Sequence, residues 1–137
     1  MRYLILTLLT ICVVNLKAQS VDSVAVRQTD SLVQLSGFYL DLGNTDHAFQ
    51  VLESAEKMAR QKIGIESPAY GTCSHNFGKI YAYKRDLINA EKWYKKAITI
   101  REKVFGKEND HYTESVFDLA TLYRRMGKNE KAEPLFI

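Results

Sequence analysis

The chain has 137 residues, of which 46% are hydrophobic and 26% charged, with 19 basic and 16 acidic side chains. This composition is ordinary for one folded domain and excludes extensive disorder. A formal charge of +3 is far from the strong basic stripe of nucleic-acid-binding proteins, so we expect no nucleic-acid partner. Two prolines and seven glycines leave long stretches without a breaker, which favours an all-α fold.

Residues 1–18 have the pattern of a secretory signal peptide. Arg2 provides the positive start, an apolar run extends from Leu4 to Val14, and Ala18 is a small residue suited to cleavage. The apolar run is shorter than the roughly 20 residues of a membrane-spanning helix, which favours cleavage over an uncleaved anchor. We therefore expect a secreted or periplasmic protein without stable membrane insertion.

The two cysteines predict neither a lipid anchor nor a disulfide. Cys12 follows the bulky Ile11, whereas a bacterial lipoprotein signal has a small residue before its cysteine. Cleavage after residue 18 would leave Cys73 alone, so no internal bridge could form. Cleavage would also remove Arg2 and Lys17, which leaves 17 basic and 16 acidic residues and a formal charge of +1.

An internal repeat of 42 residues follows the signal peptide, in a domain predicted at 19–137 with copies at about 25–66, 67–108 and 109–137. Four columns of similar residues occur in all three copies: Tyr39, Tyr81 and Tyr123; Ala48, Ala90 and Ala132; Leu35, Phe77 and Leu119; Phe38, Ile80 and Leu122. Five more columns agree in two copies: Ala55 and Ala97, Met58 and Ile100, Gly64 and Gly106, Glu66 and Glu108, Tyr70 and Tyr112.

Each copy is predicted to form two helices. Apolar residues of the first copy follow helical spacing in two runs, Leu35, Phe38, Tyr39 and Leu42, then Ala48, Val51, Leu52 and Ala55. Short turns are expected at Gly43-Asn44 and at Gly127-Lys128-Asn129. Gly64 and Gly106 are expected to end the second helices in the left-handed cap conformation. Ser67-Pro68 and Asn109-Asp110 then provide caps for the next helices.

The small alanines allow close packing of the two helices of a hairpin. Helix axes approach to about 8–10 Å when a small side chain faces the partner helix, and an aromatic residue such as Tyr81 or Tyr123 fills the space beside it. One hairpin cannot bury both of its faces, so successive hairpins stack. The sequence therefore predicts an all-α, right-handed alpha-alpha solenoid of stacked antiparallel helix hairpins.

The second and third copies resemble the tetratricopeptide repeat. The residues that match its pattern are Phe77, Gly78, Tyr81, Ala90, Tyr94 and Ala97, then Leu119, Ala120, Tyr123, Ala132 and Phe136. The longer period, with the runs 100–108 and 131–135, resembles the kinesin-light-chain type of this repeat in a bacterial secreted form. The resemblance covers about residues 29–137.

The two outer copies depart from the pattern. In the first, Ser36 replaces the small Gly or Ala and Leu52 replaces the aromatic, as expected of a capping copy. The third is expected to stop about two turns into its second helix, with Phe136 in the aromatic core column. Such an uncapped apolar end predicts either a longer array or self-association through the carboxyl end.

No catalytic or metal site is predicted. Cys73 and His75 are two residues apart on a predicted helix and point to different faces, so activation of the thiol is not favoured, and Cys73 is expected to be structural. His47, His75 and His111 are spread over the chain without a close ligand pair. We expect no cofactor and no enzymatic activity, with Gly78 serving close helix packing.

The resemblance implies a concave groove, lined by the first helix of each hairpin, that binds a protein or peptide partner. The groove positions by column are Gln34, Asp41, His75, Asn76, Lys79, Tyr83, Asp118, Thr121 and Arg125. Lys79, Tyr83, Arg124 and Arg125 could pair with carboxylates of a peptide. The alternative is that Lys84-Arg85 and Arg124-Arg125 complement helix dipoles and need no ligand.

Two functional hypotheses follow from the sequence. The favoured one is a non-catalytic protein-binding scaffold exported from the cytoplasm. The second is the sensory or docking repeat region of a larger protein, with a caspase-like peptidase or a signalling kinase downstream. The sequence beyond Ile137 would discriminate between them.

Overall fold

The computed structural model describes residues 23–136, and the predicted signal peptide at 1–18 lies outside this range. A first helix covers residues 23–41 and is followed by α2 (Thr45–Met58), η1 (Ala59–Ile63), α3 (Pro68–Tyr83), α4 (Leu87–Phe105), α5 (Asp110–Arg125), α6 (Asn129–Ala132) and η2 (Glu133–Leu135). The π-helical η1 continues α2, and η2 is a single 3-10 turn. Because residues 23–136 contain no strand, the all-α prediction is confirmed.

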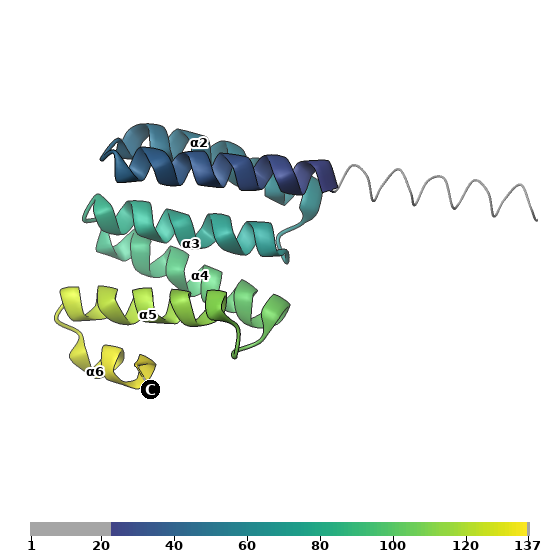
Figure 1. Ribbon diagram of the computed structural model, residues 1–137. Helices are drawn as coiled ribbons and strands as arrows, with labels where there is room; N and C mark the ends of the chain where they lie inside the picture. Colours follow the sequence, from purple (N-terminus) through teal and green to yellow (C-terminus); the bar gives the residue numbers. More distant parts are fainter. Residues whose placement is uncertain (1–22, 137) are drawn as a thin grey trace, which may run out of the picture.

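The helices form three antiparallel hairpins stacked in one direction, with the first hairpin at the top of Figure 1 and α5 and α6 at the bottom. The second helices begin at Thr45, Leu87 and Asn129, so their starts keep the 42-residue interval. α3 and α5 begin at Pro68 and Asp110, with the same interval. Since α2 packs on α3 and α4 packs on α5, the predicted solenoid of hairpins is confirmed.

Local sequence determines where the helices begin. Ser67 is extended and its Oγ accepts a hydrogen bond from the amide of Tyr70 at 3.2 Å, with Pro68 in the first helical position. The Asn109 side chain accepts from the amide of His111 at 2.9 Å. Both predicted caps are confirmed, and each contributes about 1 kcal/mol to helix stability.

The glycines that end the second helices adopt an unusual backbone. Gly64 has φ 115° and ψ 155°, and Gly106 has φ 84° and ψ 171°. The predicted helix ends are confirmed, but the left-handed cap conformation is wrong because ψ is extended. This region of backbone space is accessible almost exclusively to glycine, so the chain turns sharply into the next hairpin at these two residues.

The turns inside the three hairpins share one geometry. Gly43, Arg85 and Gly127 occupy the same column and have φ of 74°, 63° and 71°. The residue after each donates to a carbonyl five residues back, at 2.8 to 2.9 Å, which is the Schellman arrangement. Arg85 is therefore held in the left-handed region where the other two copies have glycine.

The small-residue columns are buried as predicted. Ala48, Ala90 and Ala132 face the partner helices of their hairpins. A Cβ at Gly78 would come within 2.6 Å of the Tyr94 ring, so close helix packing accounts for this glycine. The polar Ser36 stands in the same column and is also buried, because its Oγ donates to the Ala48 carbonyl at 2.7 Å.

The first helix forms as its apolar spacing predicts, but most of that apolar run is exposed. Leu35 and Phe38 are 41% and 57% exposed and Leu42 is also exposed, whereas the equivalent Phe77 and Ile80 in the second copy are 3% and 1% exposed. These columns pack each hairpin on the preceding one, and no hairpin precedes the first in the described chain. The buried side of the first helix carries Ala25, Thr29, Val33 and Ser36 instead.

The last described segment also differs from the prediction. Phe136 is exposed and meets the ring of Phe117 edge-on, with centroids 5.7 Å apart, so it does not fill a core column. Pro134 has no amide hydrogen to donate to the carbonyl four residues earlier, and the chain tightens into the 3-10 turn η2. Among residues 23–136, no helix combines the length and apolarity that a membrane crossing requires.

Candidate functional site

Two adjoining hollows lie along the face formed by the first helices of the hairpins. One, of about 600 Å³, is lined by Leu40, Lys79, Ala82, Tyr83, Arg85, Tyr94, Asp118, Thr121, Leu122 and Arg125. The other, of about 450 Å³, is lined by Ser36, Gly37, Leu40, Asp41, Asn76, Lys79, Ile80 and Tyr83. They share Leu40, Lys79 and Tyr83 and so form one groove, which we call the concave groove.

Most of the predicted groove residues line the concave groove. Asp41, Asn76, Lys79, Tyr83, Asp118, Thr121 and Arg125 all do so. They are brought together because the first helices run side by side, which places residues about 42 apart in sequence next to one another. Gln34 lines neither hollow.

His75 does not lie in the groove. Its side chain is 2% exposed and sits between α3 and α5, where its Nδ1 is 3.1 Å from Ser115 Oγ. The predicted groove position of His75 is therefore wrong, because the imidazole turns toward the neighbouring α5 rather than toward solvent. We therefore exclude His75 from the ligand-contacting set.

Several residues that line the groove were not predicted, and Leu40, Arg85 and Tyr94 are among them. Tyr94 comes from a second helix, α4, and is buried, so it forms part of the groove floor. Arg85 is a turn residue, and its column could have identified it, since the other two copies have glycine there. A long cationic side chain at a position that favours glycine is a sequence signal for a functional role.

The larger hollow carries an excess of positive charge. Lys79, Arg85 and Arg125 line it together with one acidic residue, Asp118, whose Oδ2 lies 3.5 Å from His75 Nε2. Arg125 donates to the Ala82 carbonyl at 3.2 Å, near the carboxyl end of α3. Lys79 and Arg85 form no ion pair with any described residue, so their charges are available to a ligand.

Lys84 and Arg125, two of the four cations near helix ends, have partners within the described chain. Lys84 caps α3, pairs with Asp46 Oδ1 at 2.7 Å and lies 5.4 Å from the centre of the Phe49 ring, so it joins the first hairpin to the second. Arg125 bonds to the end of the neighbouring helix, as noted. Arg125 therefore has a structural role as well as a place in the groove.

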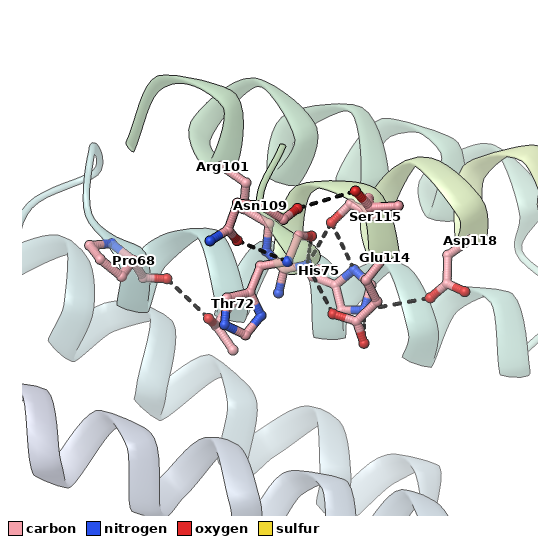
Figure 2. Close-up of polar contacts among 10 residues, drawn as sticks. Pro68, Thr72, His75, Arg101, Asn109, Glu114, Ser115 and Asp118 are labelled. Atoms are coloured by element: carbon pink, nitrogen blue, oxygen red, sulfur yellow. Dashed lines mark hydrogen bonds and ion pairs between the residues drawn. The ribbon is translucent and has the colours of Figure 1, made fainter. Parts of the chain in front are cut away.

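A buried polar cluster joins the second and third hairpins beside the groove (Figure 2). Arg101 of α4 is 2% exposed, and its Nη1 donates to the His111 carbonyl at 2.6 Å, to Ser115 Oγ at 2.7 Å and to Glu114 Oε2 at 3.2 Å. Ser115 in turn contacts His75. The guanidinium thus connects two hairpins through three acceptors on α5.

Ser115 Oγ connects Arg101 to His75. Because Arg101 is only a donor, Ser115 Oγ accepts from it at 2.7 Å, and the same oxygen lies 3.1 Å from His75 Nδ1. Nε2 of His75 faces Glu114 Oε1 at 3.6 Å and Asp118 Oδ2 at 3.5 Å. Both distances exceed a hydrogen bond, and Nε2 has no hydrogen-bond partner among the described residues.

The pKa values of Glu114 and Asp118, the two carboxylates beside His75, are shifted in opposite directions. The neighbouring His75, and then the Arg101 guanidinium, lower the pKa of Glu114 to about 2 against the effect of partial burial. Burial raises the pKa of Asp118 above its ordinary value, and His75 and Lys79 oppose that rise. Glu114 is therefore the carboxylate that the fold holds as an anion.

The structure offers no accessible nucleophile in this region. Ser115, His75 and Asp118 form a serine–histidine–carboxylate grouping, but Ser115 and His75 are buried and the hydroxyl accepts from Arg101. Cys73 is also fully buried, and burial raises the pKa of its thiol to about 12. Within the described chain, no group of three or more His, Cys, Asp or Glu side chains is arranged to hold a metal ion.

Comparison with known proteins agrees with this architecture. A family model described as tetratricopeptide repeat matches residues 28–103 and again residues 75–136. The crystal structure of BtubC (BKLC) from P. vanneervenii superposes with a TM-score of 0.71 at 19% sequence identity, covering 78% of this chain and 43% of that one. At that identity the likeness concerns the fold alone.

Two curated proteins are similar in sequence. The response regulator aspartate phosphatase E of Bacillus subtilis is 28% identical over 112 residues, which cover 82% of this chain and 29% of that protein. A clustered mitochondria protein homolog of Meyerozyma guilliermondii is 31% identical over 104 residues, which cover 74% of this chain and 8% of that protein. The chain thus spans less than a third of the length of either relative.

Proposed function

The chain belongs to the tetratricopeptide repeat family, and from this premise we propose that it is a non-catalytic scaffold whose concave groove binds an acidic peptide segment of a partner protein. The single observation that carries the proposal is the group of three cations, Lys79, Arg85 and Arg125, around one hollow of about 600 Å³. Carboxylates bound by arginine and lysine make stronger, charge-assisted hydrogen bonds than neutral groups do.

The groove combines these charges with apolar and aromatic surface. Tyr83 is exposed on the shared wall of the two hollows, and Leu40 and Tyr94 contribute apolar area. A peptide can therefore bury its side chains against the wall while its carboxylates meet the cations. The backbone of Arg85 also supports a role for this cation in binding. Its left-handed conformation costs about 1–2 kcal/mol that a glycine would avoid, so the arginine side chain is present at a cost in stability.

A peptide selection followed by quantitative binding tests the proposal. The full chain is used to select from a displayed library of random peptides, and the enriched sequences are synthesised and titrated by calorimetry. We expect enrichment of Asp, Glu or a free carboxyl terminus. Lys79→Glu should weaken binding at least tenfold, since it replaces an attractive charge with a repulsive one.

Lys92→Glu is the matched control. Lys92 is exposed on α4, outside both hollows, and its substitution changes the net charge by the same amount. Equal loss of affinity in both variants would show a general charge effect and would contradict the groove. Thermal melting of both variants checks that the fold is retained.

We further propose that the protein is exported, on the basis of the signal-peptide pattern in residues 1–18. Expression of the full gene in a bacterial host, followed by amino-terminal sequencing of the extracytoplasmic product, tests this. A mature terminus at Gln19 is the expected result, and cytoplasmic retention with Met1 intact would contradict export. Separately, we propose that the repeats are of the kinesin-light-chain type, because the interval of 42 residues between successive hairpins supports it.

The second candidate is a docking or sensory repeat region within a larger protein, with a caspase-like peptidase or a signalling kinase downstream. The observation that favours it is the chain's coverage of only 29% and 8% of its two curated relatives. Genomic sequence past the Ile137 codon tests this candidate directly. A stop codon there would reject it.

A further inference from the structure

The outer face of the first hairpin, opposite the face that packs on α3, holds a second hollow region. A hollow of about 560 Å³ lies between the helix over 23–41 and α2 with η1, and Val24, Ala25 and Met58 contribute to its apolar lining. A neighbouring hollow of about 440 Å³ shares Gln28 and Met58 with it and adds Leu32. We call the two together the outer groove; none of its lining residues belongs to the concave groove.

Exposed apolar side chains extend the outer groove along the first helix. Val24, Leu35, Phe38 and Leu42 are all exposed, and with Gln28 and Ser31 they occupy positions 24, 28, 31, 35, 38 and 42. This spacing places them in one stripe on one side of the helix. The stripe is about 27 Å long at 1.5 Å per residue, which matches a partner helix of about five turns.

The equivalent face of the second hairpin already binds a helix. Phe77, in the column of Leu35, packs edge-on against Phe49 of α2 with ring centroids 5.4 Å apart. Ile80 and Tyr70, in the columns of Phe38 and Gln28, are buried in the same cluster as Ala55 and Ala59 of the first hairpin. The fold thus shows what fits this face of a hairpin, namely one helix lying along it.

The charges at the rim of the outer groove indicate which residues flank the apolar stripe of such a helix. Arg27, Lys57 and Lys62 line the two hollows, and no Asp or Glu does. None of the three cations forms an ion pair with another described residue. The complementary ligand therefore carries acidic residues beside its apolar stripe.

We propose that the outer groove binds an amphipathic helix of a partner protein, with its apolar side in the hollow and flanking Asp or Glu residues against Arg27, Lys57 and Lys62. This site is separate from the concave groove of the proposed function. It gives the chain two binding surfaces, one for an acidic peptide segment and one for an acid-edged helix.

Other occupants fit the charges less well. A second copy placed symmetrically on the same face would bring the same three cations toward one another. Residues 1–22 contain Arg2, Lys17 and a single acidic residue, Asp22, so their net positive charge does not complement the basic rim. A bilayer surface is broad, whereas the outer groove is a hollow between two helices.

The test uses three synthetic 18-residue peptides and the full chain. The first has leucines in one helical stripe with glutamates on both sides of it, the second has lysines in place of the glutamates, and the third has the residues of the first in scrambled order. Binding is followed by fluorescence anisotropy of labelled peptides. We expect the glutamate peptide to bind at least tenfold more tightly than either of the others, and more weakly at higher salt.

Matched variants place the binding on the outer groove. The double substitution Phe38→Ser, Met58→Gln should weaken binding at least tenfold, and Lys57→Glu with Lys62→Glu should do the same. Ile88→Ser is the apolar control, because Ile88 is 77% exposed on α4, outside the outer groove. Ile88→Ser should bind like the unchanged chain. Lys79→Glu removes the contribution of the concave groove to binding of an acidic peptide, and it should keep the binding that the outer-groove variants lose.

Five results would overturn the proposal. Equal binding of the glutamate and lysine peptides would remove the role of the basic rim. Loss of binding in Lys79→Glu but not in the outer-groove variants would place the peptide in the concave groove.

The other three results would assign a different occupant to the outer groove. A concentration-dependent dimer in sedimentation that Phe38→Ser abolishes would identify a second copy. Flotation of the chain with vesicles of phosphatidylcholine and phosphatidylglycerol that depends on Phe38 would identify a bilayer. With a photo-crosslinker at position 38, cross-links to residues 1–22 of the same chain would identify that segment.

Discussion

The first and second hairpins share their residue columns and differ in what covers them. Phe77 and Ile80 are buried because the first hairpin lies on them, whereas Leu35 and Phe38 in the same columns are exposed. The two turns differ as well, with Gly43 in one and Arg85 in the other at nearly the same φ. The comparison shows that a repeat column specifies the capacity for a contact, and that the neighbouring hairpin decides whether the contact is made.

The largest expected effect is a difference in stability between substitutions of Phe77 and Phe38, which lie on equivalent faces of the second and first hairpins. Phe77→Ala should lower the free energy of unfolding by about 3–5 kcal/mol, because it opens a cavity between Phe49 and the stacked ring of Trp93. Phe38→Ala should change it by only about 0.5 kcal/mol, as for an exposed site. Urea unfolding of both variants checks the difference, and similar losses would contradict the view that the face of the first hairpin is open.

Substitution of Gly78 in the second hairpin and of Gly37 in the first should change the stability of the fold in opposite directions. Gly78→Ala should destabilise the fold by about 1–3 kcal/mol, since the added methyl would lie within 2.6 Å of the Tyr94 ring. Gly37→Ala should stabilise it by up to about 1 kcal/mol, because no atom lies within 4 Å of the new Cβ and alanine favours helix. Thermal melting measures both, and a loss of stability in Gly37→Ala would show that the first helix is more tightly enclosed than its structure indicates.

Arg85→Gly tests whether the turn of the second hairpin, which has arginine where the other two turns have glycine, favours binding at the expense of stability. Glycine relieves the left-handed backbone, which should raise the stability by about 1 kcal/mol. Removal of the cation should at the same time weaken acidic peptides in the concave groove several-fold. Gly43→Ala is the converse variant, expected to lower stability by about 1 kcal/mol. If Arg85→Gly binds peptides as well as the unchanged chain does, the turn has no part in recognition.

The smallest expected effect concerns pH at the junction of the second and third hairpins. The lowered pKa of Glu114 means that its contribution to stability is complete above the ordinary value near 4.5 and is lost as pH falls toward about 2. Because the side chain is 51% exposed, solvent screening keeps this contribution at about 1 kcal/mol or less. Unfolding of the wild type and Glu114→Gln at pH 6 and pH 2.5 should differ more at the higher pH.

Asp118 should contribute a change of stability with pH that is opposite in sign to that of Glu114. Its raised pKa means that the fold favours the protonated carboxyl, so its contribution is present at low pH and is lost as pH rises through the folded pKa. Asp118→Asn should therefore be best tolerated near neutral pH, where Glu114→Gln costs most. Parallel pH profiles of the two variants would contradict the opposite environments of the two carboxylates.

Much of the concave groove could be predicted from the columns, because residues 42 apart on parallel first helices become neighbours. His75 could not be placed in this way. Its column was assigned to the groove, but the imidazole contacts Ser115, 40 residues away, and lies close to Glu114 and Asp118. Arg101 escaped prediction for the same reason, since its acceptors are on the following helix.

The sequence by itself determined the helices, their starts, the interval of 42 residues and the fold class. Those features depend on local chemistry, such as the Ser67 and Asn109 caps and the glycines at 64 and 106, and on small residues at helix-contact spacing. Only the tertiary structure decided which face of each hairpin is covered. It left Phe38 exposed, buried Arg101 and joined Lys79, Arg85 and Arg125 around one hollow, because burial and charge pairing depend on what packs against a helix as well as on its own residues.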